Sequence, residues 1–237
     1  MYPDPSRILT AALLMLGAAV CSGCIGPKPA GELAFWPFDR GRSDPLPGIP
    51  SPAERIDSLR KMGKKAGWAK PEEREQIAKE LAAAYQDEPD PLIRLEIVRT
   101  IGQCRTATAD AVLDAALNDS EADVRMVACR AWGARGGPEA AAKLSEALRS
   151  DVDTDVRLTA AQALGETGDP RAVAALGEAL EDRDPAMQYQ AVQSLRNVTG
   201  EDLGNDVNQW RQYVKGEPPA PAEPVSVAQR IRRFFYD

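Results

Sequence analysis

The chain has 237 residues, of which 43% are hydrophobic and 27% charged, as in an ordinary folded protein. Its formal net charge of −7 predicts an acidic surface that repels phosphate, which argues against nucleic-acid binding. The chain contains no histidine, which excludes Ser-His and Cys-His nucleophile pairs and histidine-ligated metal centres, and 5% aromatic residues leave little material for an apolar cofactor pocket.

Residues 1–23 have the pattern of a signal peptide. An uncharged run rich in leucine and alanine covers residues 8–20, and a helix of that length spans only ~20 Å of the ~30 Å hydrocarbon core of a bilayer. The following Ser22-Gly23-Cys24 resembles the lipobox of bacterial lipoproteins. This resemblance implies that Cys24 is lipidated and that the protein lies in the cell envelope, membrane-anchored and facing the periplasm or exterior. Two alternatives stay open: lipidation of Cys21, or an uncleaved anchor.

Residues 24–50 are rich in proline and glycine, which predicts a disordered, semi-extended tether. Within it, Phe35, Trp36 and Phe38 form an aromatic cluster. Tryptophan and phenylalanine favour the headgroup region of a membrane, so this cluster is a candidate membrane or partner contact. The alternative is a strap that packs against the folded domain.

Residues 51–87 are expected to form an N-terminal capping pair of helices. Ser51-Pro52 and Lys70-Pro71 are suitable helix starts, because proline is favoured at the first helical position.

Residues 88–215 contain a repeat of 31 to 32 residues. Two series keep this spacing, and they consist of Arg94, Arg125 and Arg157, and of Gly102, Gly133 and Gly165. Each unit contains two amphipathic helix patterns. Asp90-Pro91 and Asp184-Pro185 supply an N-cap and a first-turn proline, while Ser120 offers a capping box to the second unit. In the third unit, we expect Gly165 and Gly168 to loosen the end of the first helix.

The third unit carries a recognisable motif in Thr154-Asp155-Val156-Arg157 and Gly168-Asp169-Pro170-Arg171. These residues resemble the HEAT repeat, and in particular the bacterial subtype named after phycobilisome lyases. The resemblance implies an all-α fold, an α-solenoid of about five stacked antiparallel helix pairs. It also implies that the repeated arginine pairs with an acidic residue of a neighbouring unit, for which Asp123 and Asp155 are the nearby candidates.

A proline-rich linker at 216–225 separates the repeats from a short basic amphipathic tail at 226–237. The tail suits an anionic membrane surface or a groove on a partner, and folding back onto the acidic solenoid is the alternative. Its candidate contact residues are Arg230, Ile231, Arg233, Phe234 and Phe235.

The sequence predicts no catalytic, cofactor or metal site. Related HEAT-like deoxyhypusine hydroxylases hold iron through His-Glu motifs, which this chain lacks. Cys129 occupies a core position, and its offset from Cys104 is too large for a disulfide. The acidic cluster between residues 151 and 155 is explained by the preference of a helix start for negative charge.

The predicted function is therefore that of a lipid-anchored envelope scaffold that binds another protein, without catalysis. Residues 88–215 contain 22 acidic and 14 basic residues, so the partner on the second-helix face is expected to be basic or polar. One alternative is a phycobilin-lyase-like or other chromophore-handling enzyme on the same fold. Another is a passive structural spacer.

Overall fold

The structure is a computed structural model, and it describes residues 50–217. This part of the chain contains ten α-helices and no strand. The helices are α2 (Pro52–Trp68), α3 (Pro71–Asp87), α4 (Pro91–Ile101), α5 (Ala107–Ala116), α6 (Ala122–Arg135), α7 (Gly137–Ser150), α8 (Thr154–Glu166), α9 (Ala172–Ala179), α10 (Pro185–Thr199) and α11 (Val207–Val214).

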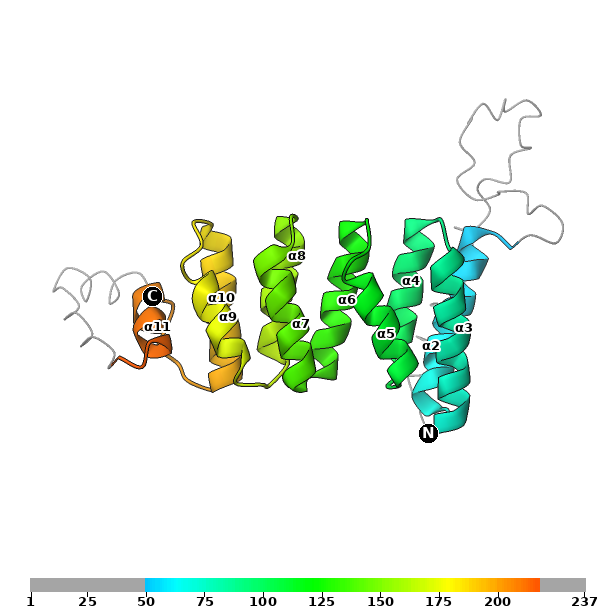
Figure 1. The fold of residues 1–237 in the computed structure, drawn as a ribbon, viewed down its shortest axis with the longest axis horizontal. Coiled ribbons are helices and arrows are strands. Elements are labelled where there is room, and N and C mark those ends of the chain that lie inside the picture. Colours follow the sequence, from blue (N-terminus) through cyan, green and yellow to red (C-terminus); the bar gives the residue numbers. More distant parts are fainter. Residues whose placement is uncertain (1–49, 218–237) are drawn as a thin grey trace, which may run out of the picture. The chain divides into compact units, whose positions relative to one another are not determined.

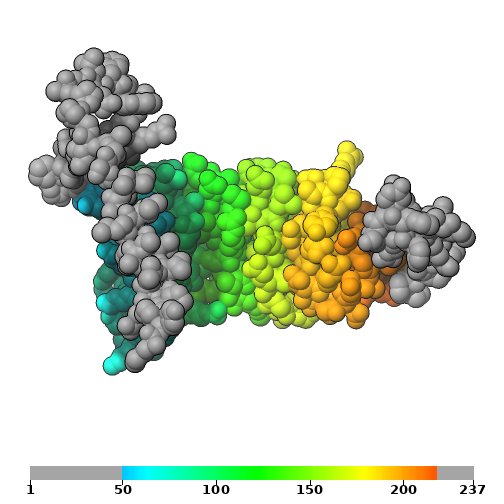
Figure 2. Space-filling view, turned by 180° about the vertical axis from the view of Figure 1, so that it is seen from behind, coloured from blue at the N-terminus to red at the C-terminus, as the bar shows by residue number. Residues whose placement is uncertain are grey.

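The helices form five consecutive pairs, and each pair packs on the next one along the chain (Figures 1 and 2). The first helices of the pairs, α2, α4, α6, α8 and α10, form one layer. The second helices, α3, α5, α7, α9 and α11, form the other layer. The prediction of an all-α solenoid of about five helix pairs is confirmed.

Helix boundaries follow the capping residues in most places. The carboxylate of Asp90 accepts a hydrogen bond from the amide of Leu92 at the start of α4, and Asp184 does the same at the start of α10. Ser51 forms a capping box with Glu54 on α2. The capping box expected from Ser120 is wrong, because the N-cap of α6 is Glu121 and no side chain caps that helix.

Two of the repeated glycines lie inside helices, where the next first helix approaches closely. A Cβ atom on Gly133 of α6 would lie 2.9 Å from Cβ of Ala163 on α8, and one on Gly165 would lie 2.8 Å from Cα of Ser194 on α10. Both distances are shorter than a van der Waals contact between carbon atoms. As expected, the end of α8 lies at these glycines, since the helix ends at Glu166 and Gly168 follows with a φ of 65°; Gly165 in addition makes room for α10.

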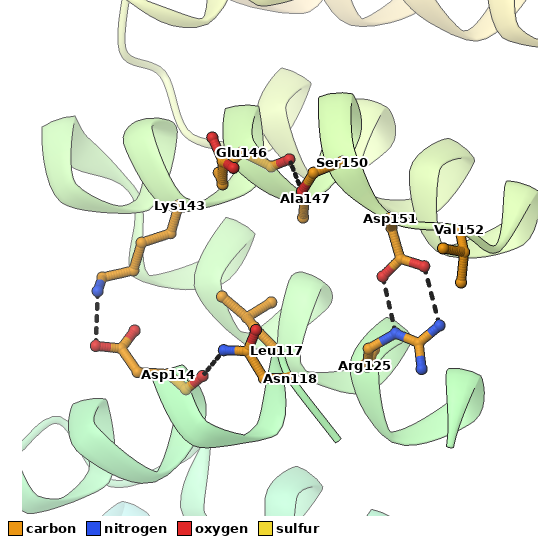
Figure 3. A pocket seen from close by; sticks show the side chains of 10 residues that line it. All are labelled: Asp114, Leu117, Asn118, Arg125, Lys143, Glu146, Ala147, Ser150, Asp151 and Val152. Atoms are coloured by element: carbon orange, nitrogen blue, oxygen red, sulfur yellow. Dashed lines mark hydrogen bonds and ion pairs between the residues drawn. The ribbon is translucent and has the colours of Figure 1, made fainter. Parts of the chain in front are cut away.

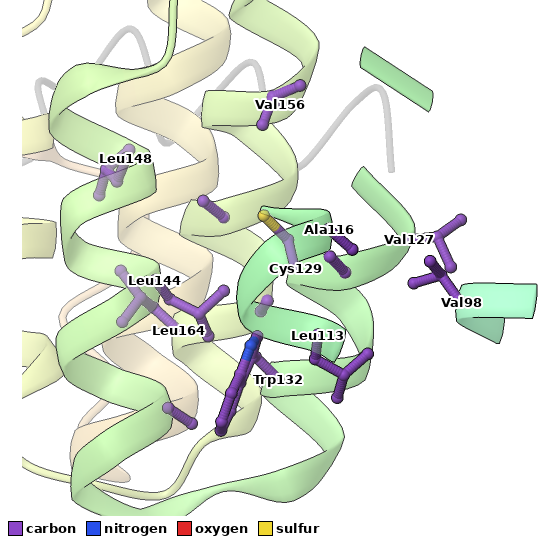
Figure 4. Close-up of a cluster of buried hydrophobic side chains, with 14 of the residues drawn as sticks. Val98, Leu113, Ala116, Val127, Cys129, Trp132, Leu144, Leu148, Val156 and Leu164 are labelled. Carbon is purple, nitrogen blue, oxygen red and sulfur yellow. The ribbon is translucent and has the colours of Figure 1, made fainter. Parts of the chain in front are cut away.

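A continuous apolar core runs between the two layers. Figure 4 shows its central part, where Trp132 of α6 lies near Leu144 of α7 and Leu164 of α8. Trp210 closes the core at the C-terminal pair, since it is fully buried and its indole N–H donates to the carbonyl of Gly204 over 2.9 Å. Each pair thus buries its apolar surface against its neighbours, as a solenoid requires.

Candidate functional site

Two of the repeated arginines tie successive loops together. Arg94, in the first turn of α4, forms a two-pronged ion pair with Asp119, with N···O distances of 2.8 and 2.9 Å. Arg125, in the equivalent position on α6, pairs with Asp151 at 2.8 and 2.9 Å. Each arginine also donates to a backbone carbonyl in the loop before its own helix. Each arginine thus holds the loop before its helix close to the loop that carries its aspartate. Most hydrogen-bond donors of both guanidinium groups are used in these contacts.

The third arginine of the series is held differently. Arg157 donates to the backbone carbonyl of Asp151 at 3.0 Å and to the hydroxyl of Thr154 at 3.1 Å. The expected pairing of these arginines with Asp123 and Asp155 is wrong: both residues lie in the first turns of α6 and α8. The carboxylates that accept from the arginines lie in the loops that end the arginines' own helix pairs, Asp119 after α5 and Asp151 after α7.

These ion pairs shift the acidity of the carboxylates. Burial by itself raises the pKa of the Asp119 carboxyl, but hydrogen bonds from Arg94, the amide of Glu121 and Tyr85 outweigh it and hold the pKa at about 2. The pKa of Asp151 is lowered in the same way, because bonds from Arg125 and the amide of Asp153 outweigh burial. Both groups are therefore charged at neutral pH.

A groove opens between α5 and α7 in the second-helix layer. The second helices α3 and α5 come within 8 Å of each other at their Cα atoms, and so do α7 and α9, but α5 and α7 do not. Figure 1 shows α5 inclined relative to α7. The groove has a volume of about 450 Å³. The pairs that flank it, α4/α5 and α6/α7, therefore contact each other through α4 and α6 in the first layer and not through α5 and α7.

An ion pair lies at each end of this α5/α7 groove (Figure 3). At one end, the ammonium of Lys143 is 2.6 Å from the carboxylate of Asp114. The same ammonium lies 5.2 Å from the centroid of the Trp132 ring, a favourable cation–π distance. At the other end lies the Arg125–Asp151 pair.

The middle of the α5/α7 groove offers both apolar and acidic contacts. Leu117, directly after α5, and Ala147 of α7 line it from opposite sides, and Val152 lies at its edge with 91% of its surface exposed. Glu146 is exposed on α7, and no ion pair or hydrogen bond involves its carboxylate within the described part of the chain. Its carboxylate is thus available to a cation.

A second groove of about 650 Å³ lies between α3 and α5. It contains the Arg94–Asp119 pair, and the hydroxyl of Tyr85 donates to Asp119 over 2.7 Å. Burial, followed by the bond to Asp119, raises the pKa of Tyr85.

The cysteines of the described residues are buried thiols. Cys104 and Cys129 are both free. Burial raises the pKa of both thiols, to about 12 for Cys129, so neither is a thiolate at neutral pH. Between residues 50 and 217 no cluster of three or more Cys, Asp or Glu side chains is arranged for a metal ion.

Several predicted contact residues lie outside the described residues. They are Cys24, Phe35, Trp36, Phe38, Arg230, Ile231, Arg233, Phe234 and Phe235. Their roles stay predictions. Among the helices of residues 50–217, none combines the length and the hydrophobicity needed to cross a membrane.

Comparison with known proteins supports the repeat assignment. A family described as HEAT repeats matches residues 78–164 and 142–205. The structure of human deoxyhypusine hydroxylase in complex with glycerol is similar over 52% of this chain, with 24% identity and a TM-score of 0.47, and this chain covers 44% of that protein. The complex of CpcE and CpcF of phycocyanin lyase from Nostoc sp. PCC7120 is similar over 67% of this chain and 96% of that chain, with 20% identity and a TM-score of 0.44.

A search of curated proteins found no match. The prediction that the chain is not an enzyme is contradicted by the two structural matches, because their names describe a hydroxylase and a lyase. The repeat fold therefore gives no ground for excluding catalysis. At these levels of similarity, the matches show the fold alone.

Proposed function

Because the chain belongs to the HEAT-repeat family, we propose that it binds a basic segment of another protein in the α5/α7 groove. Repeat solenoids use their extended surfaces for such binding. The observation that carries the proposal is the groove itself, with the unpaired carboxylate of Glu146 beside the apolar side chains of Leu117 and Ala147.

The charge of the second-helix layer favours a basic partner. The five second helices contain ten acidic and five basic residues. Lys143 and Arg125, the two cations in the groove, are already paired with carboxylates. A lysine or arginine of the partner would therefore find Glu146 free and no unpaired cation nearby. Electrostatic complementarity of this kind contributes mainly to specificity and to the rate of association.

Site-specific photocrosslinking tests this proposal. A photoreactive residue at Ser150, which lines the groove, is expected to capture a protein through a basic segment, and one at Gln162 on the first-helix layer is not. Glu146→Lys should reduce the adduct at Ser150 and weaken binding of the captured segment about tenfold, since replacing an attraction to a basic segment by a repulsion costs on the order of 1.4 kcal/mol. Equal capture from both layers, or capture that Glu146→Lys leaves unchanged, contradicts the proposal.

We also propose that a lipid on Cys24 holds the protein at the cell envelope, facing the periplasm or exterior. The support is the Ser22-Gly23-Cys24 pattern after an uncharged run. The test is the intact mass of the mature protein: a diacylated N-terminal Cys24 is the expected result, and an unmodified chain that starts at Met1 refutes it.

A further inference from the structure

The two layers of the solenoid carry opposite charge. The first helices contain twelve basic and six acidic residues, whereas the second helices contain five basic and ten acidic residues. The net charge of the whole chain, −7, conceals this difference. The first-helix layer is therefore chemically distinct from the layer that contains the α5/α7 groove.

Much of this positive charge lies on exposed side chains of α2, α4 and α6. We define the first-helix basic surface as Arg60, Lys61, Lys64, Arg99 and Arg130, all of which are exposed. Arg99 and Arg130 line one depression between α4 and α6.

Most of these cations are not neutralised by neighbouring carboxylates. Arg60 and Arg99 share one carboxylate, that of Glu96, at 3.2 and 2.6 Å. Lys61, Lys64 and Arg130 form no ion pair within the described residues. The surface therefore retains an excess of positive charge.

The repeat shows that the fold does not need these arginines. Arg99 and Arg130 occupy the same position in successive units, and the next two units have Gln162 and Gln193 there. All four residues lie on first helices. Because a neutral side chain serves the solenoid equally well at this position, the positive charge on α4 and α6 has a reason other than packing.

An exposed tryptophan accompanies the basic residues on α2. Trp68 ends that helix one turn after Lys64, and 93% of its surface is exposed. Tryptophan is enriched at the boundary between lipid headgroups and hydrocarbon, where its ring is apolar and its N–H meets water. Lysine and arginine residues beside it are attracted to anionic headgroups.

We propose that the first-helix basic surface, together with Trp68, docks on an anionic phospholipid bilayer. This inference concerns the layer opposite to the α5/α7 groove and does not depend on protein binding there. It also does not depend on lipidation. Docking through the first helices would leave the second-helix layer accessible to a partner.

The test uses the full chain carrying Cys24→Ser, so that no lipid is attached, and vesicles of phosphatidylcholine with and without phosphatidylglycerol. The test variant is Lys64→Gln/Arg130→Gln, in which the change at Arg130 introduces the residue that two other units already have. The control is Arg183→Gln/Lys215→Gln, which removes the same charge from two exposed residues near the C-terminal pairs. Thermal melts of both variants check that the fold is retained.

We expect binding to the phosphatidylglycerol vesicles to weaken about 25-fold in the test variant, since each basic residue near an anionic bilayer contributes about fivefold. The control should change by less than about threefold, because its residues lie away from the surface. In a chain with Trp36→Phe, brominated lipid should quench fluorescence from Trp68, and Trp68→Ala should remove that quenching, because Trp132 and Trp210 are buried.

Three results would overturn the proposal: equal losses in both variants, equal binding to both kinds of vesicle, or no quenching of Trp68. Binding of an acidic protein, but not of vesicles, that is lost in the test variant would also overturn it in favour of a protein partner. The crosslink at Ser150 is measured without vesicles, so failure of groove binding and failure of membrane docking are distinguishable.

Discussion

Replacing Gly133 by alanine tests the close packing of α6 against α8. The new methyl group would lie 2.9 Å from Cβ, 3.1 Å from Cα and 3.1 Å from the backbone oxygen of Ala163. Carbon atoms pack best at about 3.5 to 4.0 Å, so α6 and α8 must separate by roughly 0.5 Å or more. Two of the three atoms belong to backbone, and a side-chain rotation cannot relieve the clash.

The expected cost follows from two opposing effects. Overpacking of a core costs about 1–3 kcal/mol, and alanine is favoured over glycine within a helix by about 1 kcal/mol. We therefore expect Gly133→Ala to lower the free energy of unfolding by up to about 2 kcal/mol. Gly67→Ala is the matched control, because Gly67 also lies in a helix and no atom lies within 4 Å of its added Cβ. It should raise stability by up to about 1 kcal/mol.

Thermal unfolding followed by circular dichroism measures both variants. For a chain of this size, 1 kcal/mol corresponds to a change in Tm of about 2–4 °C. The two variants should therefore shift Tm in opposite directions. If Gly133→Ala is as stable as Gly67→Ala, the glycine is not there to allow the close approach of α8.

Three further predictions concern the core and the charged loops. The pKa of Asp119 is lowered from 3.8 to about 2, so its ionised carboxylate contributes about 2 kcal/mol of stability above pH 4, and this contribution is lost as the pH falls towards 2. The difference in unfolding free energy between the native chain and Asp119→Asn should therefore shrink over this range. A difference that does not depend on pH contradicts this prediction. Trp210→Ala removes a fully buried ring and should lower the free energy of unfolding by about 3–5 kcal/mol. Because neighbouring pairs stabilise one another, amide hydrogen exchange should speed up in α9 to α11 and remain slow in α4 and α5. A uniform loss of protection would instead show that the array unfolds as one unit. In a chain with Cys21→Ser and Cys24→Ser, a maleimide should label Cys104 and Cys129 only after unfolding, because both thiols are buried and protonated; rapid labelling of the native chain would contradict their burial.

The sequence determined the architecture because the forces that create it are local and repeated. The spacing of Arg94, Arg125 and Arg157 identifies the units, and Asp90-Pro91 and Asp184-Pro185 mark where helices begin. Each unit buries its apolar face against its neighbours, so the period alone predicts a stack of helix pairs. The lipid on Cys24 and the tail contacts fall outside the described residues and stay predictions.

Tertiary structure decided which residues meet across the units. The partners of Arg94 and Arg125 are Asp119 and Asp151, about 25 residues further along the chain, and sequence proximity suggested the wrong carboxylates. The role of Gly165 also depends on its short distance to Ser194, which lies on another helix, so the sequence of its own helix does not indicate that role.

The α5/α7 groove and the separation of charge between the layers also arise only in the tertiary structure. Whether two helices touch depends on the sizes of side chains on both of them, and whether charges gather depends on which helices share a layer. A net charge summed along the chain averages over both layers, and therefore predicted one acidic surface where the fold presents an acidic layer and a basic one.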